Sequence, residues 1–151
     1  KLTKRLKGMH TIAFESWNGY DIEGFVFEKQ AKEYAELMAV DCLSIYGDKF
    51  TVNADDVTGI GNNVLLDFGQ FDFGENPVSA VAVTGRSKLP MNTINIITSG
   101  DTEGRVIINF EQADEYTERV FPVENLSGKC GVTFTFLPGS DFDFKSFRFI
   151  K

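Results

Sequence analysis

The sequence predicts an all-β protein, an antiparallel β-sandwich. Phenylalanine is unusually common, with 15 copies against four tyrosines and one tryptophan, and aromatic residues favour half-buried pleated sheets. From residue 8 onward, short apolar or alternating runs recur, each followed by a turn-rich break. No long helical segment separates these runs, so we expect about ten strands in antiparallel sheets and no βαβ units.

The first part of the chain contains two strand-like runs and one exception to the all-β pattern. Residues 9–16 and 24–28 begin the series of strands. Residues 28–37, EKQAKEYAEL, are almost entirely good helix formers. They predict a short helical segment before the strand LMAVD at 37–41, too short to organise the fold.

The rest of the chain alternates with a period of two, as expected of strands with one buried face. Residues 50–68 contain a strand, a turn and a second strand, with Gly59, Gly61, Asn62 and Asn63 at turn positions. Surface hairpin tips are expected at SGDTEG and NLSGK. The later strands are expected at 78–85, 93–98, 105–111, 117–123, 131–137 and 146–150.

Length and charge indicate one domain, residues 1–151, with no nucleic-acid partner. The net charge is −7, whereas phosphate binding needs a concentrated basic surface. The opening segment KLTKRLK is basic, and we interpret Lys1, Lys4, Arg5 and Lys7 as a solvated lead-in strand or linker.

The ends and the hydropathy of the sequence carry two further expectations. No apolar run is long enough to span a membrane, and the start lacks the apolar segment of a signal peptide, which favours the cytoplasm and excludes a membrane partner. The sequence begins with Lys1 and not with Met, which indicates a piece of a longer protein.

No catalytic motif is present in the sequence. The single histidine, His10, lies in an alternating run with no neighbour that would orient it, so it is expected to be a structural strand residue. The 22 acidic residues leave a glycosidase-type carboxylate pair open as an alternative, but exposed acids are the usual case in a protein with a pI of about 4.7. Cys42 and Cys130 are expected to be unpaired core thiols, with a disulfide across the sandwich as the alternative. We expect a non-catalytic chain without a cofactor.

Three segments, taken together, resemble the family 6 carbohydrate-binding modules. They are MAVDCLSIYGDKF at 38–50, the stretch from GIGNNVLLDF to VTGRS at 59–87, and VTFTFLPGSDFDFKSFRF at 132–149. They are most similar to the module-like domain near the C-terminus of bacterial family 2 glycoside hydrolases of the β-galactosidase type. The resemblance covers roughly residues 35–151, and residues 1–34 form a poorly matched lead-in segment.

The resemblance implies a jelly-roll β-sandwich that holds a sugar without breaking a bond. Its partners would be a galactoside or plant polysaccharide and the catalytic domain of a β-galactosidase-type hydrolase. The alternative is a structural domain that packs against that catalytic domain or mediates oligomerisation, which would show an apolar patch on one sheet face.

The resemblance also suggests where the sugar would bind. Asp143 falls where the family commonly has a sugar-contacting Asn, and with Asp141 it would project from a loop to accept hydrogen bonds from sugar hydroxyls. Asn62 and Asn63 lie in the family's Gly-polar segment, where a β-turn role is the equal alternative. Phe147 and Phe149 are expected to face the core from one side of the last strand.

Two departures from the family pattern concern calcium and the aromatic platform. Met38, Val40 and Lys145 stand where the family has calcium-binding carboxylates, so the structural calcium is expected to be absent. Val64 replaces the usual tryptophan. Tyr46 and Trp17 remain as candidate sugar-contacting rings, with core or loop packing as the alternative for each. They complete a candidate carbohydrate-binding set with no catalytic and no metal site: Asp143, Asn62, Asn63, Tyr46 and Trp17.

Overall fold

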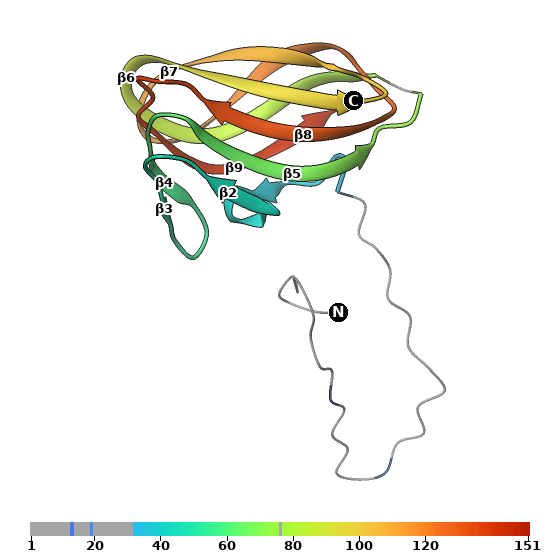
Figure 1. Cartoon of the computed structure of the whole chain (residues 1–151), viewed down its shortest axis with the longest axis horizontal. Helices are drawn as coiled ribbons and strands as arrows, with labels where there is room; N and C mark the ends of the chain where they lie inside the picture. The colour runs from blue at the N-terminus through green and yellow to red at the C-terminus, as the bar shows by residue number, and fades with distance from the viewer. Residues whose placement is uncertain (1–12, 14–18, 20–31, 76) are drawn as a thin grey trace. The chain divides into compact units, whose positions relative to one another are not determined.

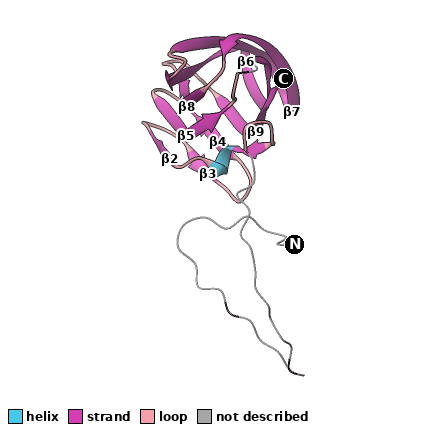
Figure 2. Ribbon diagram, turned by 90° about the vertical axis from the view of Figure 1, so that its right-hand side faces the viewer, coloured by secondary structure: helices cyan, strands magenta, loops and turns pink. Residues whose placement is uncertain are grey.

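The computed structural model describes residues 13, 19, 32–75 and 77–151. Residues 32–75 and 77–151 form an antiparallel β-sandwich with one short 3-10 helix, η1 (Ala39–Asp41). The curled sheet wraps around its own core (Figure 2). In this part of the chain no helix is long and apolar enough to cross a membrane. The predicted fold class is confirmed. The strands are β1 (Leu37–Met38), β2 (Ser44–Tyr46), β3 (Thr51–Val52), β4 (Val57–Ile60), β5 (Val64–Asp72), β6 (Val78–Gly100), β7 (Gly104–Leu126), β8 (Lys129–Phe136) and β9 (Phe142–Ile150).

The helix predicted over 28–37 is wrong for the part that the structure describes. Residues 32–36 form a turn that leads into β1, which begins at Leu37, and 28–31 lie outside the described residues. Lys32 donates a 2.6 Å hydrogen bond to the Phe68 carbonyl and lies over the Phe71 ring. These tertiary contacts outweigh a weak local helix preference. The predicted strands at 9–16 and 24–28, with His10, also lie outside the described residues, apart from Ala13.

The strands follow one continuous path, β2-β5-β8-β6-β9-β4-β3, with β7 paired to β6 and β1 paired to β9 (Figure 1). The second half of β6 pairs with β8, and its first half pairs with β9. Strand β6 therefore belongs to both layers of the sandwich. Strand β7 follows it antiparallel along almost its whole length.

The two long strands explain why the expected strand count was higher. The runs 78–85 and 93–98 both belong to β6, and 105–111 and 117–123 both belong to β7. Between them the register shifts twice, leaving extra residues at 88–90 in β6 and 114–116 in β7. Such bulges bend a strand and increase its twist, which takes both strands from one layer to the other. The predicted hairpin tips at 99–104 and 125–129 are confirmed.

Strand β9 contributes four phenylalanines to the core, two more than its alternation predicts. Phe147 and Phe149 are buried, as expected, but so are Phe142 and Phe144, which have the opposite parity. A one-residue register shift against β6 separates the two pairs. A bulge that adds one residue changes which face the following side chains occupy. The strand thus directs both pairs inward.

The two cysteines are not joined to each other. Cys130 is a free thiol, fully buried in β8, and Cys42 packs at the margin of the same core. Burial raises the pKa of the Cys130 thiol, since a thiolate would lose its hydration there. Cys130 is therefore an unreactive core residue.

Candidate functional site

The loop between β8 and β9, residues 137–141, is fixed by neighbouring elements through its backbone; we call it the closing loop. The Asp141 N–H donates to Asn92 Oδ1 at 3.0 Å, and the Asp141 carbonyl accepts from Ser87 Oγ at 2.7 Å. The Gly139 N–H donates to Asn62 Oδ1 at 2.7 Å. The β6 bend and the β4–β5 turn thus hold this loop, while the Asp141 side chain is exposed.

A cavity of about 330 Å³ lies between the closing loop and the bends of the two long strands. Residues 86–88 of β6, 113–114 of β7, Asp141 and Asp143 line it. We call it the charged cavity, because five of its seven lining residues carry charge. The bulged segments contribute Lys88 and Asp114. The register shift that joins the two layers therefore also builds this cavity.

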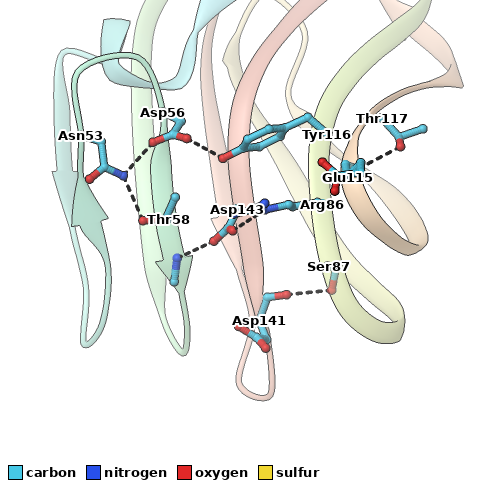
Figure 3. Close-up of polar contacts among 11 residues, drawn as sticks. Asn53, Asp56, Thr58, Arg86, Ser87, Glu115, Tyr116, Thr117, Asp141 and Asp143 are labelled. Carbon is cyan, nitrogen blue, oxygen red and sulfur yellow. Dashed lines mark hydrogen bonds and ion pairs between the residues drawn. The ribbon is translucent and has the colours of Figure 1, made fainter.

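Asp143 crosslinks three strands at one wall of the charged cavity (Figure 3). Its carboxylate accepts a 2.8 Å hydrogen bond from Arg86 Nε on β6 and a 2.7 Å hydrogen bond from the Gly59 N–H on β4. Gly59 has a φ of 60°, a left-handed conformation that glycine adopts without strain. The Asp143 carboxylate raises the pKa of Arg86 above its already high usual value, so this guanidinium is permanently charged.

Tyr116 lies beside this ion pair and connects it to Asp56, the residue before β4. Its hydroxyl donates a 2.5 Å hydrogen bond to Asp56, while the Arg86 guanidinium lies 4.9 Å and the Lys145 ammonium 5.3 Å from the ring centroid. Burial, and then the Asp56 carboxylate, raise the pKa of Tyr116 well above its usual range. The Tyr116 ring holds the Arg86 guanidinium in place by cation–π attraction.

The five residues predicted for sugar binding do not form one group. Asp143 lines the charged cavity, whereas Asn62 and Asn63 do not. Asn62 positions the closing loop, and Asn63 adopts a left-handed φ of 52° and donates to Asp48 at 3.2 Å. The side chains of both asparagines therefore bond to other segments of the chain, and their part in sugar binding stays a prediction. Tyr46 is 60% exposed on β2, away from the lining of the cavity, and Trp17 lies outside the described residues. Their part in binding stays a prediction.

The positions expected to lack calcium ligands have other contacts. Lys145 makes a 3.7 Å ion pair with Asp55, and the Met38 N–H donates to the Asp41 carboxylate. Val40 packs against the core. Among the described residues, no three His, Cys, Asp or Glu side chains are grouped so that they could hold a metal ion. Calcium independence stays a prediction.

Sequence reasoning missed Arg86, Lys88, Asp114 and Tyr116. Each lies in or next to a short polar stretch that interrupts the alternation, GRSKLP in β6 and ADEYT in β7. Because both interruptions fall between two strand-like runs, they resembled ordinary loops. The strand pairing places the two polar stretches opposite each other. The signal in the sequence is therefore that each stretch lies at the same place, between two strand-like runs.

The comparisons with known proteins concern the fold. No protein-family model and no curated protein matches the sequence. A family 6 carbohydrate-binding module from Clostridium stercorarium, solved with cellobiose, is 16% identical with a TM-score of 0.68, and the match covers 79% of this chain and 95% of that one.

Two further solved structures are similar to the same extent. The family 6 module from Clostridium cellulolyticum, in complex with xylose, is 20% identical with a TM-score of 0.67, over 79% of this chain and 98% of that one. The β-1,3-glucan-binding module from Bacillus halodurans is 18% identical with a TM-score of 0.65, over 79% and 97%. The chain therefore has the β-sandwich fold of the family 6 carbohydrate-binding modules.

Proposed function

We propose that this chain is a non-catalytic carbohydrate-binding domain that holds a sugar in the charged cavity. The observation that carries the proposal is the state of Asp141. Its backbone is fixed on both sides by Asn92 and Ser87, and Asp141 is one of the residues that line the cavity. Its carboxylate has no hydrogen bond or ion pair within the described part of the chain, and the residue is exposed. An acceptor that is held in place but left without a partner is suited to a ligand with hydroxyl groups.

The other groups of the cavity complement such a ligand. Arg86 is held through its Nε by Asp143 and by the Tyr116 ring, and its side chain is 40% exposed. Its remaining N–H groups and the Lys88 ammonium are donors for sugar oxygens, while Asp114 and Asp141 are acceptors. A volume of about 330 Å³ is at the small end for ligand sites, which suits one or two sugar rings.

The affinity of this site is expected to be weak. Sugar-binding sites gain much of their affinity from an aromatic ring against the apolar face of a pyranose, and among the described residues no aromatic side chain lines the charged cavity. The neighbouring ring, Tyr116, is covered by two cations. We therefore expect a dissociation constant in the ~millimolar range.

The identity of the sugar, the absence of a calcium requirement and the type of parent protein belong to the same proposal. We infer that the ligand is a galactoside or a plant polysaccharide, bound without calcium, and that the longer protein is a β-galactosidase-type glycoside hydrolase. The sequence segments 38–50, 59–87 and 132–149 support this parent. A domain that binds the substrate polymer would keep it near the active site of that enzyme.

The test is a glycan-array screen followed by titration of the 151-residue chain, with and without a calcium chelator. Asp141→Ala should abolish measurable binding, and Glu124→Ala is the matched control, since Glu124 is an exposed carboxylate outside the cavity lining. Binding that survives in Asp141→Ala would place the sugar elsewhere. Silence of the wild-type chain across the array would refute sugar binding.

A structural domain remains the second candidate, because large apolar side chains are exposed on one layer. Tyr46 and Ile107 are 60% and 53% exposed, and the pairing places them in one cross-strand row on the same face. Leu65, Thr135 and Asn95 lie between them in that row. Sedimentation of the chain tests this candidate, since replacing Tyr46 and Ile107 by Ser should dissociate an oligomer that uses this face.

A further inference from the structure

The edge strands of the sheet differ greatly in length. At the two ends of the strand path, β2 and β3 contain three and two residues. Strand β7 contains 23 residues and, within the described part of the chain, pairs only with β6. The N–H and C=O groups along its other side therefore have no strand partner there. Such an edge is a template for an additional strand, and very short edge strands are one way in which proteins avoid this pairing.

The two halves of β7 are protected against such pairing to different degrees. The second half contains Pro122, which lacks an N–H group, and the bulge at 114–116 comes before it. Both features oppose the addition of a strand. Residues 104–111 contain no proline and pair with residues 91–98 of β6 without a register shift. They are rich in strand-forming residues, and Ile107 is 53% exposed. The first half of β7 is therefore a regular and open edge.

We propose that residues 104–111 of β7 are a self-association edge, to which a second copy of this chain adds its own β7 in antiparallel orientation. In a two-fold dimer each contact occurs twice, because residue i of one copy meets residue j of the other and the reverse. Paired residues lie on the same face of a sheet, so only registers that pair positions an even number of residues apart are possible. A second copy is the occupant because one of these registers makes the edge complementary to itself.

The register centred on Ile108 is self-complementary in charge. It places Arg105 opposite Glu111 of the second copy, and the two-fold axis repeats this pair. Both residues are exposed, and the Glu111 side chain to 69%. The ion pair that Arg119 of the same chain makes with Glu111 uses Oε2, which leaves Oε1 for the added strand. Directly opposed residues of opposite charge stabilise a sheet.

The inner face of the same register is apolar throughout. Val106 lies opposite Phe110 of the second copy, and Ile108 lies opposite its own equivalent. Ile108 and Phe110 belong to the buried core, and Val106 packs against it. The register therefore brings no charged side chain toward the core of either copy.

The two neighbouring registers fit less well. A centre at Ile107 would place Glu111 opposite Glu103, and like charges directly opposite destabilise a sheet. A centre at Asn109 would place Glu111 opposite the exposed Ile107. The charge pattern along the edge thus selects the register centred on Ile108.

The expected dimer is weak and independent of sugar binding. Eight residues in each copy are fewer than the roughly 20–30 on each side of a standard interface. We therefore expect a dissociation constant of about 10–100 µM. The dimer uses the edge of the sheet and not the exposed face that carries Tyr46, which distinguishes it from association through that face.

The experiment is sedimentation velocity of the 151-residue chain at concentrations from about 1 µM to 1 mM, without sugar. Arg105→Glu and Glu111→Arg each place like charges opposite one another at two positions of the dimer. Each should raise the dissociation constant about fivefold or more. The double variant reverses the pair without removing it, so it should return to within about twofold of the wild type.

Two lysine variants of the same strand provide a matched comparison. Ile107→Lys places a charge at the open edge and should weaken the dimer, because edge lysines oppose strand addition. Val120→Lys is the control, since Val120 is 55% exposed but lies in the protected second half of β7. It should leave the dissociation constant unchanged. Denaturant unfolding of each variant shows that the fold is intact.

Every outcome decides for or against the self-association edge. A chain that stays monomeric at about 1 mM would overturn it. A dimer that the single charge variants leave unchanged, or that Tyr46→Ser disrupts, would place the interface elsewhere and contradict it as well. A double variant as weak as either single variant would rule out the register. Because the measurement contains no sugar, failure of the dimer leaves the proposed function standing, and failure of sugar binding leaves the dimer standing.

Discussion

The closing loop and the strand that follows it, β9, each contain one aspartate but use it in opposite ways. In the loop, the backbone of Asp141 is bonded on both sides and its side chain is exposed. In β9, the Asp143 side chain is bonded to Arg86 and Gly59, and the four phenylalanines are buried. Asp141 therefore makes its structural hydrogen bonds through its backbone, whereas Asp143, only two positions later, makes them through its side chain.

This difference separates stability from binding along the chain. A side chain that makes structural hydrogen bonds is not available to a ligand without loss of those bonds. A side chain whose backbone is held by neighbours is both available and already ordered, which lowers the entropy cost of binding. We therefore expect substitutions in β9 to affect unfolding and substitutions in the closing loop to affect binding.

The largest effect is expected for Phe144→Ala. Phe144 is fully buried, and its ring lies 5.1 Å from that of Phe134 between centroids, with Phe147 at 6.2 Å. Truncation of a buried phenylalanine costs about 3–5 kcal/mol, measured by denaturant unfolding. Leu137→Ala in the closing loop is the control and should change stability by less than about 0.5 kcal/mol. Equal losses for the two variants would contradict the division between loop and strand.

The next effect distinguishes the two aspartates directly. Asp143→Ala removes two hydrogen bonds to a charged acceptor, one of them from a cation, and should cost about 2 kcal/mol after allowance for partial exposure. Asp141→Ala should stay within about 0.5 kcal/mol of the wild type. The comparison fails if Asp141→Ala is the more destabilising variant in the same unfolding assay.

The smallest effect is expected for Tyr116→Phe, which removes the hydrogen bond to Asp56 and should cost about 1 kcal/mol near neutral pH. The pKa of Tyr116 is raised on folding, so the folded state favours the neutral phenol. Its contribution is complete below the unfolded pKa of about 10 and is lost as the pH rises above that value. Unfolding curves of both proteins should therefore converge at high pH. A constant difference up to strongly alkaline pH would show that Tyr116 does not titrate in this way.

Local patterns predicted the strand-and-turn part of this structure well. The turn at Pro138 and Gly139, the hairpin tips, and the inward direction of Phe147 and Phe149 all follow from residue type and period-two alternation. The helix at 28–37 failed in its described part because Lys32 contacts β5, a strand more than 30 residues later. Local propensity carries no information about such contacts.

The candidate site was predicted only in part for the same reason. Asp141 and Asp143 were identified as a pair in one polar turn, but nothing in their spacing shows that Arg86 bonds one and not the other. Arg86 and Tyr116 reach the site through bulges in two separate strands. Asn62 was identified, but nothing in the sequence shows that its Oδ1 accepts a hydrogen bond from the Gly139 N–H.

By itself, the sequence determined the all-β class, most turns and the inward direction of Phe147 and Phe149, because steric preference and burial periodicity act over a few residues. Only the tertiary structure decided that β6 and β7 each cross both layers and that Phe142 and Phe144 turn inward. It also decided that the charged cavity forms where the closing loop meets the bends of β6 and β7. These features depend on register between distant strands, and a one-residue shift in register exchanges the buried and exposed faces.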